Sequence, residues 1–234
     1  MLFASMGLAT MAQTTVEPED AKRAIAECHR LHSEGEYATA LTLIEKIDVR
    51  SLDERTKQEF ALLKALTTFQ NSHREGKALM LQYLNNYPNS SQRELLNSYI
   101  AQSLYLDGDF EGACALFAQS EMSRLANEER ERAELYYALS LLENGQESNA
   151  IDMLQRLRME SKRYATEATF HLAVIDYDNG DIDKAYSAFK SIQMEDEHYL
   201  DIPYYLAGIE LKRGNSDAAR NIASRFIADH GDKP

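Results

Sequence analysis

The sequence predicts an all-α fold, a right-handed superhelical solenoid of about six helical hairpins. A six-residue pattern supports this prediction: Gly, usually an acidic or amide residue, three variable positions, then Ala. It recurs at Gly35, Gly108, Gly145, Gly180 and Gly214. The last four glycines are 37, 35 and 34 residues apart, and a period near 34 residues is typical of stacked helical hairpins. No segment alternates apolar and polar residues over the length of a strand, so no sheet is expected.

The first hairpin has clear start and stop signals. Its first helix is expected over 19–34, because acids in the first turn favour a helix N-terminus. Ala24, Cys28 and Leu31 then fall on one apolar face. Gly35 should end this helix, since glycine tolerates the left-handed conformation found at helix C-termini. The partner helix is expected over 37–47.

The second hairpin departs from the pattern. Ser51 and Glu54 have the spacing of a capping box. The turn reads Gln-Asn-Ser-His over 70–73 in place of the expected glycine, and Gly76 comes three residues late. Ala78 is expected to be the small residue of the second helix, which should end at 87–88, where proline cannot continue it.

The other four hairpins follow the pattern more closely. Ser91 and Glu94 form a second capping box at the start of the third hairpin. Glu128 and Arg132 are spaced to pair at i, i+4 on a solvated face of the fourth. In the third hairpin the first helix is expected to end near 107 and the second to span 110–119. The fourth hairpin is expected from 127 onward and over 147–158, the fifth over 164–179 and 182–192, and the sixth over 201–213 and 216–230.

The termini lie outside the repeats. Residues 1–12 form an uncharged apolar run in which Thr10 and Ala12 occupy the −3 and −1 positions of a signal peptidase site. We expect a signal peptide there with a truncated n-region, a disordered leader over 13–18, and a repeat array over 19–230. Residues 231–234 are expected to be a tail or the end of a cloned segment. The apolar run is too short to span a bilayer, so no direct membrane insertion is expected after signal removal.

Composition limits the range of functions. A net charge of −13 argues against nucleic acid, since binding to phosphates needs clustered Lys and Arg. It also argues against a bare anionic membrane surface, and it suits a soluble protein or a scaffold for a basic partner. Cys28 and Cys114 form neither a CxxC pair nor a zinc-ligand spacing, so both are expected to be small buried residues.

The hairpins carry two further registered positions. The residue seven before each turn glycine is small: Cys28, Ala101, Ala138, Ala173 and Ala207. The residue nine after it is apolar and large in the first, third, fourth and fifth: Ile44, Phe117, Leu154 and Phe189. In this pattern the chain resembles the tetratricopeptide repeat (TPR) family, although the family's Trp is absent and its closing Pro is clear only at Pro88. The tyrosine-rich segments and Asn86–Ser90 are also similar to TPR arrays of Gram-negative envelope proteins, which implies export to the periplasm or envelope.

No catalytic motif stands out. The sequence has no Gly-rich phosphate loop, no HExxH and no nucleophile elbow, so we expect no enzyme activity, cofactor or metal. His29 and His32 could share a metal at i, i+3, but a third ligand is missing, and two solvated polar residues are the plainer interpretation. His171 should be structural. The Asp-rich segments at 107–109 and 178–183 should be turns with helix N-caps, and residues 195–198 a solvated acidic loop.

The resemblance implies that the first helix of each hairpin lines a concave groove that binds a protein or peptide. The stripe expected to bind comprises Gln102, Tyr105, Leu139, Leu142, Phe170, Val174, Tyr177, Tyr204 and Leu211. We identified no Lys or Arg in it, which disfavours recognition of an acidic peptide terminus. These side chains could instead pack against the next hairpin. Two other functions stay open: a structural N-terminal arm of a larger TPR assembly, and a metal-dependent activity around His29 and His32.

Overall fold

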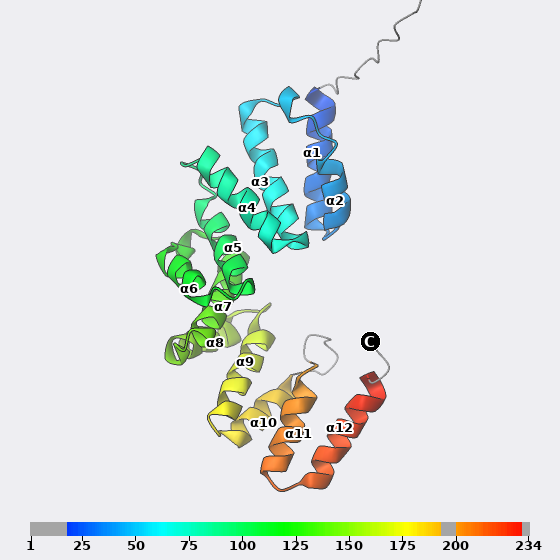
Figure 1. Ribbon diagram of the computed structural model, residues 1–234, viewed down its shortest axis with the longest axis vertical. Coiled ribbons are helices and arrows are strands. Elements are labelled where there is room, and N and C mark those ends of the chain that lie inside the picture. The colour runs from blue at the N-terminus through cyan, green and yellow to red at the C-terminus, as the bar shows by residue number, and fades with distance from the viewer. Residues whose placement is uncertain (1–17, 193–199, 231–234) are drawn as a thin grey trace, which may run out of the picture. The chain divides into compact units, whose positions relative to one another are not determined.

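The part of the chain that this computed structural model describes, residues 18–192 and 200–230, contains twelve α-helices, two short 3-10 helices and no strand (Figure 1). The predicted all-α class is therefore confirmed. The expected signal peptide over 1–12, most of the leader, the acidic loop over 195–198 and the tail over 231–234 lie outside the described residues.

The helices pair in chain order, and the chain divides into two compact units, 1–93 and 94–234. Two hairpins belong to the first unit: α1 (Pro18–Ser33) with α2 (Tyr37–Ile44), and α3 (Glu54–Asn71) with α4 (His73–Asn86). The other four are α5 (Arg93–Leu106) with α6 (Phe110–Gln119), α7 (Asn127–Glu143) with α8 (Glu147–Glu160), α9 (Ala165–Asp178) with α10 (Ile182–Ser191), and α11 (Ile202–Lys212) with α12 (Ser216–His230). The 3-10 helices are η1 (Val49–Ser51) and η2 (Met122–Arg124).

Five of the hairpins turn in the same way. Their turn glycines have φ between 72° and 85°, the left-handed region that a side chain disfavours. The amide after each glycine donates to the carbonyl five residues earlier, from Glu36 N to Leu31 O at 2.9 Å in the first hairpin and from Asn215 N to Glu210 O at 2.8 Å in the last. This bond is the mark of a Schellman C-terminus, so the predicted role of the glycines is confirmed.

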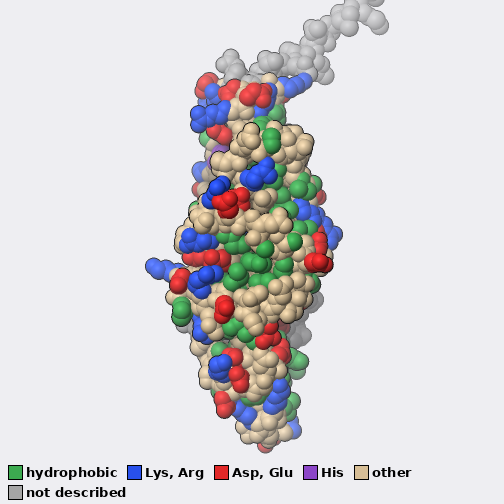
Figure 2. Space-filling model, turned by 90° about the vertical axis from the view of Figure 1, so that its left-hand side faces the viewer, with side chains coloured by type: hydrophobic (Ala, Val, Ile, Leu, Met, Phe, Trp, Pro, Cys, Tyr) green, Lys and Arg blue, Asp and Glu red, His purple; other side chains and the backbone are tan. Residues whose placement is uncertain are grey.

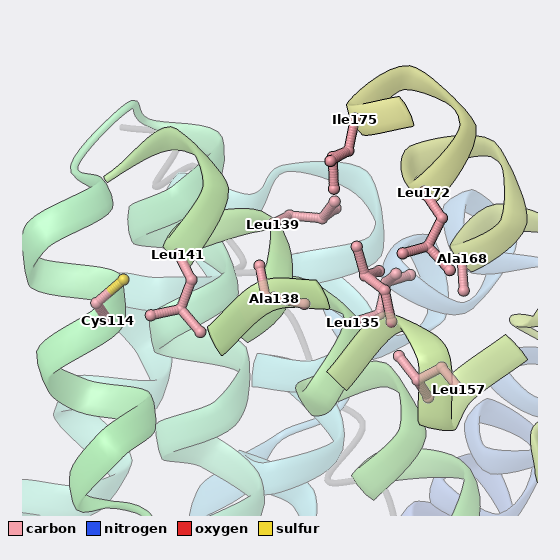
Figure 3. Close-up of a cluster of buried hydrophobic side chains, with 11 residues drawn as sticks. Cys114, Leu135, Ala138, Leu139, Leu141, Leu157, Ala168, Leu172 and Ile175 are labelled. Atoms are coloured by element: carbon pink, nitrogen blue, oxygen red, sulfur yellow. The ribbon is translucent and has the colours of Figure 1, made fainter. Parts of the chain in front are cut away.

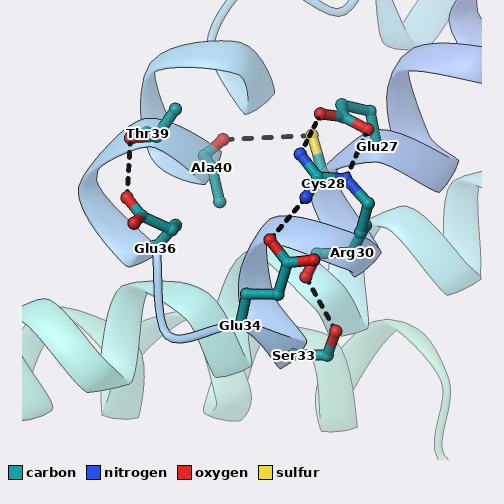
Figure 4. A network of polar contacts seen from close by, with 8 residues as sticks. All are labelled: Glu27, Cys28, Arg30, Ser33, Glu34, Glu36, Thr39 and Ala40. Carbon is teal, nitrogen blue, oxygen red and sulfur yellow. Dashed lines mark hydrogen bonds and ion pairs between the residues drawn. The ribbon is translucent and has the colours of Figure 1, made fainter.

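Small residues let the two helices of a hairpin approach closely. Cys28 of α1 is fully buried, and its Sγ lies 3.9 Å from the carbonyl oxygen of Ala40 in α2 (Figure 4). The same figure shows Arg30 on the outer side of α1, held between Glu27 and Glu34. Both cysteines are free and buried, as expected, and burial raises the pKa of each thiol.

The registered apolar positions form the core. Ile44, Phe117, Leu154 and Phe189 are all buried, which confirms the register of four hairpins. In the last hairpin Ala223 is exposed and Phe226 is partly buried. Figure 3 shows the cluster around α7, where Ala138 and Leu141 face Cys114 on one side, and Leu135 and Leu139 face Leu172 and Ile175 of α9 on the other. Each first helix thus serves both its own hairpin and the next.

Both predicted capping boxes are wrong. The N-cap of α3 is Asp53, whose carboxylate accepts from Thr56 N at 2.9 Å. Glu94 accepts a hydrogen bond from the backbone amide of Glu121 at 2.9 Å. This bond connects α5 to the loop before η2. Among the predicted turn caps, Asp109 accepts Gly112 N at 2.9 Å, whereas Asp181 makes no side-chain cap and lies 3.6 Å from Lys184. The sequence position of an acidic residue near the start of a helix is therefore not enough to identify the N-cap.

The second hairpin turns without glycine. Ser72 has φ −150° and ψ 102°, and this extended residue both ends α3 and caps α4. Gly76 is therefore not a late turn glycine. It is buried inside α4, where an added Cβ would lie 2.4 Å from Phe69 Cα. Ala78 is exposed, so its predicted role as the small contact residue is wrong, and Gly76 fills that role.

Replacing Gly76 with Ala should destabilise the first unit by about 1–3 kcal/mol, because the new methyl group meets backbone that cannot move aside. The higher helix propensity of Ala, worth about 1 kcal/mol, only partly offsets this cost. Ala78→Leu, two residues away on the exposed face, should change stability by less than about 0.5 kcal/mol. Urea unfolding of the two variants measures both effects. The reverse ranking would show that Ala78, and not Gly76, faces α3.

Candidate partner-binding surface

The nine predicted groove residues all lie on α5, α7, α9 and α11, within the second unit. The structure brings them onto the first helices, and it buries them to different degrees. Gln102 and Leu139 are buried. Tyr105, Leu142, Phe170, Val174 and Tyr177 are partly buried, all of them packed against the clusters that join consecutive hairpins. Only Tyr204 and Leu211 are exposed. Most of the stripe thus packs between hairpins, and we name the surface formed by α5, α7, α9 and α11 the first-helix face.

Aromatic rings connect neighbouring hairpins across this face. The ring centroids of Tyr105 and Tyr136 are 5.6 Å apart, in an edge-to-face arrangement. Tyr205, which sequence reasoning did not single out, is a second centre: its ring is 5.4 Å from Tyr177 of α9 and stacks on Phe189 of α10 at 4.9 Å. Such pairs add about 0.5–1.5 kcal/mol beyond the area that they bury. Two of the three stripe tyrosines, Tyr105 and Tyr177, therefore pack edge-on against rings of a neighbouring hairpin.

A cation, Arg132, lies next to the stripe on α7, at a repeat position that the nine predicted residues leave out. Arg132 lies one turn before Leu135 on α7, and its side chain is only 12% exposed. The guanidinium lies 3.6 Å from the centroid of the Tyr99 ring and donates to Glu129 at 2.9 Å and to Ser98 Oγ at 3.0 Å. It also donates to Gln102. The sequence did contain a signal for this residue: Arg132 occupies a repeat position of the first helix, four residues before Tyr136.

The predicted ion pair between Glu128 and Arg132 is consequently wrong. Glu128 pairs with Arg163 instead, and Arg132 is held in a largely buried site rather than on a solvated face. Burial raises the pKa of Tyr99 to about 12, against the opposing effect of the Arg132 charge. Because Glu129 neutralises the guanidinium, Arg132 is a structural residue and is not free to bind an acidic ligand.

The outer end of the face is different, because its apolar residues are exposed. Tyr204 is 74% exposed and Leu211 is 59% exposed. Gly208 lies between them on α11, and a Cβ at that position would lie 2.8 Å from the hydroxyl oxygen of Tyr177. The Tyr177 ring in turn has Lys212 Nζ 3.7 Å from its centroid. Tyr204 and Leu211 thus form an exposed apolar surface along α11, and the Tyr177 side chain lies against Gly208 between them.

Carboxylates surround the tyrosines of this face. Burial is the main cause that raises the pKa of Tyr105, and the charges of Glu143 and Glu167 raise it further. Burial likewise raises the pKa of Tyr205, with added contributions from Asp178 and Asp201. His171 lies 3.2 Å from Glu167, which agrees with its expected structural role. Carboxylates thus act on both Tyr105 and Tyr205, in addition to burial.

The two histidines of α1 have different surroundings. His29 is exposed, whereas His32 Nδ1 lies 3.0 Å from Thr67 Oγ1 of α3 and its ring packs edge-on against Tyr37. No group of three or more potential metal ligands occurs among the described residues. In the same residues no helix has the length and apolar character needed to cross a bilayer.

A surface hollow outside the first-helix face is lined by side chains that pair with one another. A hollow of about 440 Å³ between α7 and α8 is lined by Glu131, Glu134, Arg156 and Ser161, among others. Ser161 Oγ donates to Glu131 at 2.7 Å, and Arg156 lies 3.6 Å from Glu134. On the face drawn in Figure 2, acidic and basic side chains lie next to one another and frame a central group of hydrophobic side chains. No continuous basic tract covers that face, and a basic tract is what nucleic acid would require.

Comparison with known proteins supports the tetratricopeptide repeat family. Two tetratricopeptide repeat family models match residues 132–158 and 176–234, and these ranges contain helices of the last three hairpins. Together with the hairpin geometry, the matches support placing the repeats of this chain in that family. A search of curated proteins by sequence found no significant match.

Solved structures agree on the fold. The apo form of the quorum sensor NprR from B. thuringiensis matches with a TM-score of 0.72 and 16% identity over 92% of this chain and 66% of the sensor. This chain thus spans just under two thirds of that protein. Pseudomonas aeruginosa pilF matches at 0.67 with 13% identity, over 92% of this chain and 94% of its own. YrrB, a TPR protein with an unusual peptide-binding site, matches at 0.54 with 17% identity, over 77% and 90%. At these identities the likeness concerns the fold alone.

Replacing Arg132 with Met should destabilise the second unit by about 1–3 kcal/mol, because Glu129, Ser98 and Gln102 lose their shared donor in a largely buried site. The methionine keeps most of the apolar stem, so the loss reports the polar contacts. Arg124→Met is the matched control, since Arg124 pairs with Glu121 on the surface, where such pairs contribute about 0–1 kcal/mol. Chemical unfolding followed by circular dichroism measures both. Equal effects would show that Arg132 is an ordinary surface cation.

Proposed function

We propose that the protein is a non-enzymatic interaction scaffold that binds a protein or peptide segment on the first-helix face, with Tyr204 and Leu211 of α11 as its anchors. One observation carries this proposal. Along a stripe whose other members are buried or half-buried between hairpins, these two large side chains remain mostly exposed. Exposed aromatic and aliphatic side chains on a rigid helix are the groups that most often dominate the energy of an interface.

The fold supports the proposal. TPR-type arrays present extended surfaces to protein or peptide partners, and YrrB is described as having a peptide-binding site. In this chain α11 is held on two sides, by α12 within its hairpin and by the aromatic cluster of Tyr205 with α9 and α10. A side chain on such a helix loses little conformational freedom on binding, which lowers the entropic cost of association. The geometry therefore provides anchors that are already positioned.

The anchors are tested by capture from cells that express the protein. The full chain carrying Tyr204→Ala and Leu211→Ala should retain less than about a tenth of the captured partner, because anchors of this kind each contribute on the order of 2 kcal/mol. Quantitative mass spectrometry of the captured proteins gives the measurement.

The matched control carries Met159→Ala on α8 and Ile227→Ala on α12. Met159 is 74% exposed, as is Tyr204, and Ile227 is 65% exposed, so the control removes similar exposed apolar surface away from the first-helix face. It should capture the partner like the unaltered chain. Equal losses in both double variants would exclude the first-helix face as the binding surface. Thermal unfolding of both variants separates loss of binding from loss of fold.

We also propose that the protein is exported to the periplasm or cell envelope. The support is the apolar run over 1–12 with Thr10 and Ala12 at the signal-peptidase positions. Expression of the full open reading frame in its own host should give a mature chain that begins at Gln13, detected by intact-mass analysis of the envelope fraction. Recovery of the uncleaved chain in the cytosol would contradict export and leave the interaction proposal in place.

A further inference from the structure

Tyrosine rings near the first-helix face repeatedly receive cations from the chain itself. Arg132 lies over Tyr99 at 3.6 Å, and Lys212 lies over Tyr177 at 3.7 Å. Arg163 approaches the Tyr164 ring at 5.7 Å. A cation within about 6 Å of an aromatic centroid is attracted by the negative face of the ring. These three contacts show that the surroundings of this face favour a positive charge on a tyrosine ring.

Tyr204 is an exposed ring that no cation of the described residues uses. It contacts the Tyr205 ring edge-on at 5.5 Å, and no Lys or Arg in the described part of the chain lies over it. At 74% exposure it is also the most accessible large apolar residue of the face. A cation from a second molecule can therefore reach it without displacing an internal contact.

The local charge has the sign that attracts such a cation. Asp201 is exposed three residues before Tyr204, a spacing that places the two side chains next to each other on one side of the helix. Asp178 is exposed at the end of α9, and both carboxylates act on the adjacent Tyr205. Neither forms an ion pair with a described residue. An exposed ring with one uncompensated carboxylate beside it, and a second carboxylate near the adjacent Tyr205, is complementary to a Lys or Arg side chain.

Resting on the proposed function, we infer that the partner is a basic amphipathic helical segment that places a Lys or Arg on the Tyr204 ring and an apolar side chain against Leu211. The spacing of the two anchors favours a helical partner. Seven residues of α11 separate the two anchors, roughly 10.5 Å along the helix axis. Side chains on one side of an extended strand recur about every 6.6 Å and miss this distance, whereas positions i and i+7 of a helix lying along α11 match it. The overall charge of −13 favours the same sign of partner.

The test uses two synthetic amphipathic peptides of 18 residues that differ only in the charged side chain. One has Leu and Lys in a seven-residue helical repeat, and the other has Glu in place of every Lys. Fluorescence anisotropy with the full chain should give a Kd at least about tenfold lower for the Lys peptide. Equal affinities, or no binding of the Lys peptide at millimolar concentration, would overturn the inference.

Variants separate recognition at the ring from general attraction to an acidic protein. Tyr204→Leu keeps the apolar area but removes the aromatic face, and it should raise the Kd of the Lys peptide by about 3- to 30-fold, the range expected for a cation on a ring. Tyr204→Phe keeps the ring and should bind like the unaltered chain. Asp201→Asn should weaken binding and lower its salt dependence, while Asp152→Asn, at an exposed position on α8, should do neither.

The outcomes also separate this inference from the proposed function. If Asp201→Asn and Asp152→Asn have equal effects and Tyr204→Leu has none, the Lys peptide binds by net charge, and the inference is wrong. If, in addition, the variant with Tyr204→Ala and Leu211→Ala still loses its cellular partner, the first-helix face remains the binding surface and only the basic character of the partner is rejected.

Discussion

The close approach of the two helices within each hairpin is the constraint on which the rest of the structure depends. Ala, Cys or Gly must occupy the contact point, because any larger side chain would separate the helices and open the core between them. Cys28 against Ala40 and Gly76 against Phe69 show the two extremes of this requirement. With the helices at this distance, large apolar residues of the second helix, such as Phe117 or Phe189, are buried between them.

The same constraint decides what remains for binding. A hairpin that is only two helices thick cannot bury both sides of its first helix, so that helix also packs against its neighbour. Leu139 and Phe170 are used in this way, in clusters that contain residues from consecutive hairpins. Residues in equivalent repeat positions therefore have different fates. They are buried where a following first helix covers them, and exposed on α11, where Tyr204 and Leu211 lie.

The sequence was sufficient for the parts of the fold that depend on a single residue type at a fixed position. A positive φ strongly favours glycine, and a close contact between two helices favours Ala. The turns and the register of the hairpins could therefore be predicted. The second hairpin could not, because Ser72 forms an extended turn without glycine and the register shifts so that Gly76, not Ala78, meets Phe69. Caps and ion pairs were also missed. Glu54, Glu94 and Glu128 each have several partners within reach of their spacing, and only tertiary packing selects among them.

The sequence predicted which helices carry the candidate surface. It did not predict which of their side chains are exposed or where the charges lie. Repeat positions identified the helices that carry it, whereas the choice between buried and exposed positions depends on contacts between hairpins that no single repeat encodes. The cations show this most clearly. The chain has 25 Lys and Arg against 38 Asp and Glu, and on this face Arg132 is neutralised by Glu129 while Lys212 is placed on Tyr177. Once these cations are used internally, the charges that remain near Tyr204 and the adjacent Tyr205 come from Asp201 and Asp178. The preference for a basic partner therefore arises from where the few cations are placed inside the fold, and the net charge alone would not have located it.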